Sequence, residues 1–138
     1  MRTEDKSRRH KLIEIDIPLG IFPYNLSSLE AVTKYLKENL KMPYSEIARL
    51  LNRDDRTIWG TYRRSIRKYP LNFDMISKAD FVPSTLFRNR NLGALEALTL
   101  YLREERALRY CQIAEILNRD DRTVWTAFKR AKVKTSAG

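Results

Sequence analysis

The sequence has almost none of the residues from which catalytic and metal sites are usually built. It contains one cysteine, Cys111, and one histidine, His10, in 138 residues. A single cysteine cannot close an internal disulfide, and one cysteine with one histidine falls short of the ligand set of an ordinary zinc site. The sequence therefore predicts no metal and no cofactor, and an enzyme is the least favoured class of function.

Glycine and proline are scarce as well, with 4 and 5 copies, so long flexible linkers are not expected. The apolar runs are only a few residues long, far below the roughly 20 residues that span a bilayer. The first eleven residues are strongly charged and do not resemble a secretory signal. These features predict a soluble cytoplasmic protein without a membrane partner, which would be associated with the nucleoid in a prokaryotic cell.

Acidic residues are fewer than basic ones: the chain has 17 Asp and Glu and 27 Lys and Arg, which gives a formal net charge of +10. A field of this sign attracts polyanions, chiefly nucleic acids and anionic membranes. Charge alone is a weak indication, so the positions of the basic residues decide what it means.

The chain contains an internal repeat. Residues 27–67 align without a gap with residues 93–133, an offset of 66, and 19 of these 41 positions are identical. An identical block, NRDDRT, occupies residues 52–57 and 118–123. Such a repeat predicts two copies of one small folding unit.

The repeat divides the chain into a basic N-terminal arm (1–11), a first unit (12–69), a linker (70–80) and a second unit (81–134). Units of this size are each marginally stable alone. We therefore expect the two units to pack together or to be supported by a second chain.

Helical periodicity dominates both units and predicts an all-α fold with roughly three to four helices in each unit. Ile13, Ile15 and Ile17 instead alternate with acidic residues, which is the pattern of a short N-terminal β-strand. A lone strand needs a partner, and we expect this one to pair with residues 79–82 or with a second chain.

The first predicted helix of the first unit spans residues 27–41, and its counterpart in the second unit spans 93–107. Ser27 and Glu30 form an S-x-x-E capping box at its start. Its apolar residues recur at helical spacing and predict a buried face made of Leu29, Val32, Leu36 and Leu40.

A short second helix follows over residues 45–51, with Ser45 as its N-cap. Asn52 comes next, and asparagine tolerates the left-handed conformation that ends a helix in a tight turn. A third helix begins at Asp54 or Asp55 and runs to about residue 68. Its predicted buried residues, with their equivalents in the second unit, are Ile58, Tyr62, Ile66, Val124 and Phe128.

This order of helices and turn resembles the helix-turn-helix family. A small residue, Ala48 or Ala114, lies four positions before the turn asparagine, and a β-branched residue, Ile58 or Val124, lies six positions after it. The stretch SEIARLL of residues 45–51 is most similar to region 4 of sigma-70-type factors. The resemblance covers about 25 residues in each unit, and it implies that the third helix of each unit lies in the major groove of DNA.

The resemblance also implies which side chains face the bases. Arginine can bind two acceptors of guanine at once, and Arg56 and Arg122 stand at the starts of their helices, so we favour DNA contact over a plain solvated charge. The predicted base contacts are Arg56, Trp59, Gly60, Arg63, Arg122, Trp125, Thr126 and Lys129. For the two tryptophans the alternative stays open that they seal the core or a contact between the units.

A second set of basic residues is predicted to contact phosphates, which adds affinity and salt dependence without sequence choice. The alternative is a solvated helix end at which the macrodipole favours cations. This set is Arg53, Arg64, Arg67, Lys68, Arg119, Arg130, Lys132 and Lys134. In the arm, Arg8, Arg9 and Lys11 either enter a minor groove or follow the phosphates, or they have no role.

The acidic pairs Asp54–Asp55 and Asp120–Asp121 precede the two third helices. Paired carboxylates can indicate metal binding or acid–base chemistry. N-capping of the following helix is the favoured interpretation, because these are the residues that cap helices best.

These features predict a sequence-specific protein that binds double-stranded DNA and reads two similar half-sites with two recognition helices, as a transcriptional regulator does. It could also associate with itself or with RNA polymerase. The alternatives are a nucleoid-organising, partition or scaffold protein that binds DNA without sequence choice and oligomerises, and an adaptor for RNA polymerase.

Overall fold

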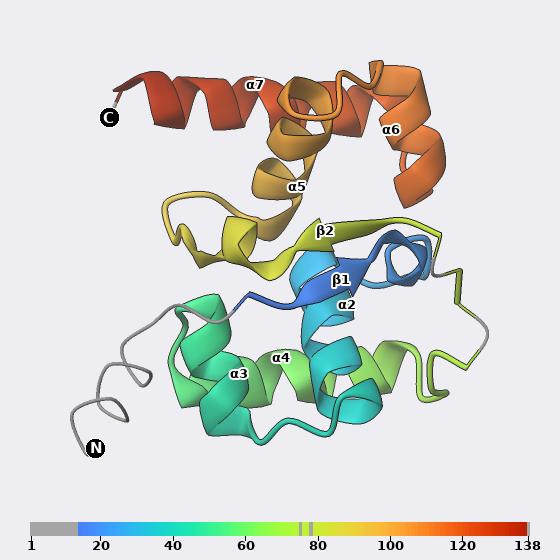
Figure 1. Ribbon diagram of the computed structural model, residues 1–138, viewed down its shortest axis with the longest axis vertical. Helices are drawn as coiled ribbons and strands as arrows, with labels where there is room; N and C mark the ends of the chain where they lie inside the picture. The colour runs from blue at the N-terminus through green and yellow to red at the C-terminus, as the bar shows by residue number, and fades with distance from the viewer. Residues whose placement is uncertain (1–13, 75, 78, 138) are drawn as a thin grey trace, which may run out of the picture.

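The computed structural model describes residues 14–74, 76–77 and 79–137, so the basic arm predicted over residues 1–11 lies outside the described residues. The elements repeat in the same order in the two halves (Figure 1). The first half consists of β1 (Asp16–Pro18), the 3-10 helix η1 (Leu19–Ile21), α2 (Ser28–Lys34), the π-helical turn η2 (Tyr35–Asn39), α3 (Tyr44–Leu51) and α4 (Asp55–Lys68). The second half consists of β2 (Phe81–Pro83), η3 (Ser84–Arg88), α5 (Ala94–Glu104), α6 (Tyr110–Leu117) and α7 (Asp121–Ala137). The predicted all-α fold with a short N-terminal strand is confirmed.

The halves meet at an antiparallel pair of strands, in which Ile17 of β1 lies opposite Val82 of β2. These two residues hold equivalent places in the IPL and VPS segments that open the two halves. A strand that pairs with its own equivalent in antiparallel register creates an approximate two-fold axis at that point. The flanking bonds follow it, since Leu19 N donates to the Asp80 carbonyl (2.9 Å) and Ser84 N donates to the Ile15 carbonyl (2.8 Å).

This pairing resolves two expectations from the sequence. The N-terminal strand pairs with the segment that follows the linker, which was one of the two partners predicted for it. The two halves also pack together, because one hydrophobic core contains buried residues of both, among them Phe22, Leu36, Phe87 and Leu98. Phe22 and Phe87 face each other across the axis, with ring centroids 6.4 Å apart.

Each half is completed by the other. The helix α3 of the first half packs on η3 of the second, and α6 of the second packs on η1 of the first. Asn52 donates from its side chain to the Arg88 carbonyl (3.0 Å), and Asn118 donates to the Pro23 carbonyl (3.1 Å). Because elements of each half contact the other half, packing fixes the relative orientation of the halves in addition to the chain connection.

The helix starts are partly as predicted. The capping box is confirmed, since Glu30 N donates to Ser27 Oγ (3.2 Å) and Ser27 N donates to Glu30 Oε1 (3.0 Å). The N-cap predicted at Ser45 is wrong, because α3 begins one residue earlier, after Pro43. Pro43 holds extended backbone with φ −70° and ψ 159°, and its carbonyl accepts the N–H of Glu46 and of Ile47.

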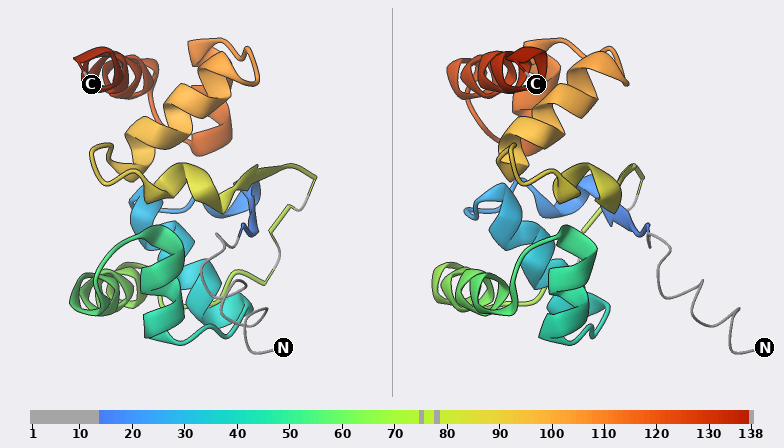
Figure 2. Two further views of the ribbon diagram at one scale, coloured as in Figure 1. Left: turned by 60° about the vertical axis from the view of Figure 1, so that its left-hand side comes forward. Right: turned by 90° about the vertical axis from the view of Figure 1, so that its left-hand side faces the viewer.

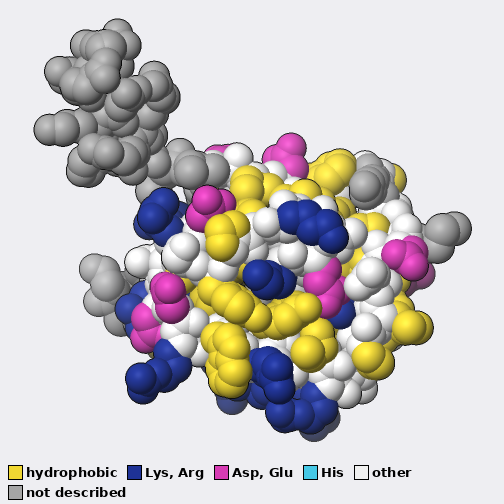
Figure 3. Space-filling model, turned by 90° about the horizontal axis from the view of Figure 1, so that it is seen from below, with side chains coloured by type: hydrophobic (Ala, Val, Ile, Leu, Met, Phe, Trp, Pro, Cys, Tyr) yellow, Lys and Arg dark blue, Asp and Glu magenta, His cyan; other side chains and the backbone are white. Residues whose placement is uncertain are grey.

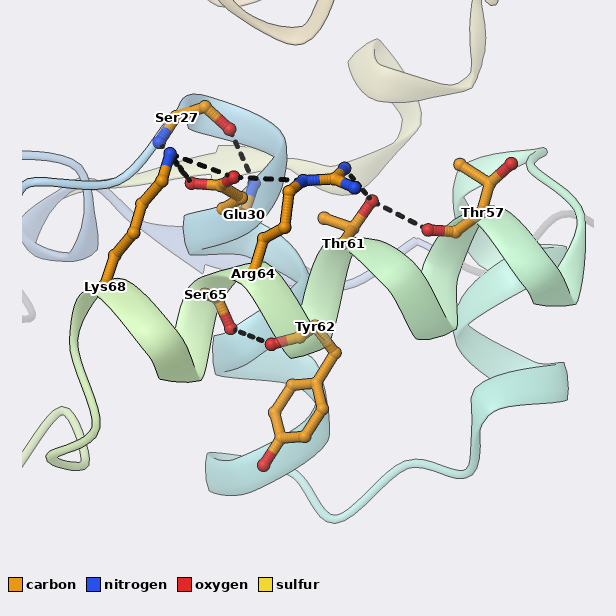
Figure 4. Close-up of polar contacts among 8 residues, drawn as sticks. All are labelled: Ser27, Glu30, Thr57, Thr61, Tyr62, Arg64, Ser65 and Lys68. Atoms are coloured by element: carbon orange, nitrogen blue, oxygen red, sulfur yellow. Dashed lines mark hydrogen bonds and ion pairs between the residues drawn. The ribbon is translucent and has the colours of Figure 1, made fainter.

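The buried face of α4 also differs from the prediction. Ile58 is buried as expected, but its buried companions are Thr61 and Ser65, whereas Tyr62 and Ile66 are only half-buried. The hydroxyl groups of Thr61 and Ser65 donate to carbonyls within the helix (2.7 and 2.6 Å), so both can be buried (Figure 4). These small side chains lie on the face of α4 that packs on α2. In the second half α7 packs on α5, and its buried residues include Val124, Ala127 and Ala131, while Phe128 is half-buried.

Two further findings concern exposure. Leu40, predicted to be buried in the first helix, is 39% exposed because the helix ends in a π-helical turn at Asn39. Among the described residues, no helix combines the length and the apolar composition needed to cross a membrane.

Candidate nucleic-acid interface

The two long helices α4 and α7 occupy matching places at opposite ends of the molecule. In Figure 1 they lie at the bottom and the top of the long axis and run in opposite directions. Both views of Figure 2 show them on the same side of the molecule, which is the left in each view. This is the arrangement expected of two helices related by the two-fold axis through β1 and β2.

Each of these helices is preceded by the same turn. Asn52 ends α3 with φ 57° and ψ 47°, and Asn118 ends α6 with φ 54° and ψ 48°, so the predicted left-handed conformation is confirmed in both halves. Asp54 Oδ1 accepts the N–H of Thr57, and Asp120 Oδ1 accepts the N–H of Thr123, each at 2.7 Å.

The N-capping interpretation of the aspartates is therefore confirmed. The bond from the backbone of Thr57 lowers the pKa of Asp54, and the bond from Thr123 does the same for Asp120. In the part of the chain that the structure describes, no three acidic, histidine or cysteine side chains gather as a metal site would require.

The outer face of α4 carries Arg56, Trp59 and Arg63, which are all exposed. These positions are spaced by three and four residues, so they share one face of the helix. The outer face of α7 carries the equivalents Arg122, Trp125 and Lys129, also exposed, while Gly60 and Thr126 lie half-buried within the two faces. All the residues predicted to contact bases thus fall on two equivalent surfaces.

The tryptophans do not seal the core. Trp59 is 51% exposed and Trp125 is 50% exposed. Each ring is covered in part by the basic residue one turn later, with the Arg63 guanidinium 5.4 Å from the Trp59 ring and the Lys129 ammonium 5.7 Å from the Trp125 ring. A cation held over a half-exposed indole makes a surface that is both positive and flat.

Two residues predicted to contact phosphates are bound to the protein itself. Arg53 donates to the carbonyls of Leu51 (2.7 Å) and Phe87 (2.9 Å). Arg119 donates in the same way to the carbonyls of Leu117 and of Leu26 in the other half. Both arginines therefore close the end of a helix and fasten it to the opposite half.

Other members of that set form ion pairs at the surface. Lys68 lies 3.0 Å and Arg64 3.5 Å from the buried carboxylate of Glu30, the residue of the capping box (Figure 4). Lys134 makes the equivalent pair with Glu96 at 2.8 Å, and Lys132 lies 2.7 Å from Glu104. The basic side chains remain 40–54% exposed in these pairs, so they stay accessible to a polyanion. Arg67 and Arg130 are exposed.

The structure also shows a basic and an aromatic side chain in contact at the start of α3, a pair that the sequence did not predict, and its equivalent at the start of α6. The Lys37 ammonium lies 4.2 Å from the Tyr44 ring, and the Arg103 guanidinium lies 4.4 Å from the equivalent Tyr110 ring. Figure 3, which views the end that holds α3 and α4, shows Lys and Arg side chains set among hydrophobic ones. The repeat could have predicted these pairs. At the offset of 66, Lys37 corresponds to another basic residue, Arg103, and Tyr44 corresponds to Tyr110.

Comparison with models of protein families, with curated proteins and with solved structures finds no significant match to this chain. Its function must therefore be inferred from its own residues.

Proposed function

We propose that the chain is a sequence-specific protein that binds double-stranded DNA, with α3–α4 and α6–α7 acting as two helix-turn-helix units. The observation that carries the proposal is the pair of equivalent Arg–Trp–basic surfaces on α4 and α7, which lie on one side of the molecule (Figure 2). In this proposal α4 and α7 enter the major groove and present their exposed faces to base edges.

The chemistry of these faces suits base recognition. Arg56 and Arg122 stand in the first turn of their helices, and an arginine fork matches the two acceptors that guanine shows in the major groove. Trp59 and Trp125 offer flat apolar surface beside them, which can contact a thymine methyl group or a sugar. The exposed basic residues at the later turns, including Arg67 and Arg130, are placed to contact phosphates.

The size of the molecule also fits. A compact chain of this length has a radius of gyration of about 14 Å and a diameter of about 35–40 Å. Helices at the two ends of its long axis are then on the order of 30 Å apart, close to the roughly 34 Å of one turn of DNA. Two successive major grooves on one face of the duplex can therefore be reached together.

A transcriptional regulator is the biological role that we favour. The high positive charge equally suits a nucleoid or scaffold protein that binds DNA of any sequence, and the test separates the two. If the chain were instead an adaptor for RNA polymerase, DNA binding by the chain alone would be weak.

The test is selection from a random duplex library at about physiological salt, followed by sequencing. We expect one recovered motif. Arg56→Ala should remove the preference for one base position, whereas the matched variant Arg67→Ala should lower affinity on every sequence and leave the motif unchanged. Recovery of no motif, with binding that fades steeply as salt rises, would refute sequence-specific binding and favour the nucleoid role.

A further inference from the structure

The structure carries an inference about the form of the DNA site, which rests on the proposed function. We infer that the site is an inverted repeat with fixed spacing, whose half-sites match where α4 and α7 are identical and differ where they are not. Three features lead to this inference: the symmetry, the rigidity and the differences between the two helix faces.

The symmetry sets the orientation of the half-sites. The β1–β2 pairing relates the halves by an approximate two-fold axis, and α4 and α7 run in opposite directions on one side of the molecule (Figures 1 and 2). Two recognition helices related by such an axis make the same contacts on opposite strands of the two half-sites, which gives an inverted repeat. Two units arranged head to tail would give a direct repeat, and the sequence alone was compatible with either.

The rigidity sets the spacing. The halves share one core, and Asn52, Arg53, Asn118 and Arg119 fasten each turn to the backbone of the opposite half. Two domains on a flexible linker can adapt to half-sites at several separations. This chain cannot, because a change in separation would require these contacts and the β1–β2 pairing to break.

The helix faces set which positions match. Arg56 and Trp59 have identical equivalents in Arg122 and Trp125, so the base pairs that they contact should be the same in the two half-sites. Gly60 and Arg63 are replaced by Thr126 and Lys129. Threonine adds a methyl and a hydroxyl where glycine has neither, and lysine lacks the two-pronged fork by which arginine selects guanine. The base pairs that these residues contact should therefore differ between the half-sites.

Packing does not explain these differences. A Cβ at Gly60 would meet only the Arg64 side chain, at 3.6 Å, which is ordinary contact. Arg63 and Lys129 are both exposed. Packing therefore permits a side chain at position 60. The difference between Gly60 and Thr126 can then act on the choice of base.

The double variant Gly60→Thr/Arg63→Lys tests the inference, because it gives α4 the same predicted base-contact residues as α7. Selection with the wild type should yield an imperfect inverted repeat, and selection with the variant should yield a symmetric one built from the half-site of α7. The control variant Arg67→Ala should leave the asymmetry unchanged. Identical wild-type half-sites, or a variant site as asymmetric as before, would overturn the assignment of Gly60 and Arg63.

Designed duplexes test orientation and spacing. The selected half-sites, arranged as inverted and as direct repeats with equal spacing, should differ in affinity by at least about tenfold in favour of the inverted form. Insertion of roughly half a turn or of a full turn between the half-sites should each reduce affinity to that of a single half-site. Equal binding to direct repeats, or recovery with the full-turn insertion, would overturn this inference while the proposed function stands. Failure to select any motif would overturn both.

Discussion

The guanidinium of Arg53 donates a hydrogen bond to the carbonyl oxygen of Phe87, 2.9 Å away in the opposite half of the molecule. The same group also donates to the Leu51 carbonyl at the end of α3. A residue that the sequence marks as a surface cation beside a turn therefore joins the two halves, and Arg119 repeats the arrangement with Leu26.

This contact predicts a stability effect that is independent of DNA. Arg53→Ala should lower the free energy of unfolding by about 1–3 kcal/mol, because two carbonyls lose a charged donor in a half-buried place. The matched variant Arg67→Ala, at an exposed position, should change it by less than about 0.5 kcal/mol. Urea unfolding measures both, and equal stabilities for the two variants would contradict the role given to Arg53.

Two glutamates at helix starts, Glu30 and Glu96, predict how stability depends on pH. Burial opposes ionisation of Glu30, but the N–H of Ser27 and the ammonium of Lys68 outweigh it, so the pKa of Glu30 lies below its ordinary value of 4.5. The pKa of Glu96 is lowered in the same way, where Lys134 and the N–H of Gly93 outweigh burial. A carboxyl with a lowered folded-state pKa stabilises the fold above its unfolded-state pKa, and this contribution is lost as pH falls through the folded-state pKa.

We therefore expect the free energy of unfolding to fall between about pH 5 and pH 3. Glu30→Gln should flatten this fall, because glutamine can still accept the Ser27 N–H in a capping box but carries no charge to titrate. The matched control is Glu115→Gln, at an exposed position on α6. Urea unfolding at several pH values gives the slopes, and the same slope for Glu30→Gln and the wild type would refute the prediction.

Two glycines should respond to alanine in opposite directions. A Cβ at Gly20 would lie 2.6 Å from the Ser77 carbonyl oxygen and 2.8 Å from the Ser77 nitrogen, so Gly20→Ala must displace backbone. A loss of about 1–3 kcal/mol is expected for such overpacking. Gly60 lies inside α4 with room for a methyl group, so Gly60→Ala should stabilise by about 0.5–1 kcal/mol. Thermal unfolding measures both, and a stable Gly20→Ala variant would show that the linker does not pack there.

The tryptophans provide reporters for the proposed interface. Trp59 and Trp125 are the only two tryptophans in the chain, so Trp59→Phe and Trp125→Phe each leave one indole, about half exposed in the free protein. Binding of a duplex in the major groove should shield both rings, and acrylamide quenching should decrease in each variant. Quenching that is unchanged on binding would place the DNA on another surface.

The sequence by itself determined the local structure of this protein. The capping box of Ser27, the left-handed turn at Asn52 and the N-cap at Asp54 are all confirmed. Each depends on hydrogen bonds within about five residues, so the residue types and their spacing suffice to predict them. The repeat likewise predicted two similar units, because equivalent residues meet equivalent neighbours within each unit.

Only the tertiary structure decided how the units are joined. The sequence left open whether the N-terminal strand pairs within the chain, and it did not show that Arg53 and Arg119 bond to the opposite half. It also predicted Tyr62 instead of Thr61 in the buried face of α4, because residue type indicates hydrophobicity and does not show how close α2 lies. The contacts of Arg53 and Arg119 join residues 34 and 93 positions apart. Packing in three dimensions selects such contacts, and local patterns do not encode them.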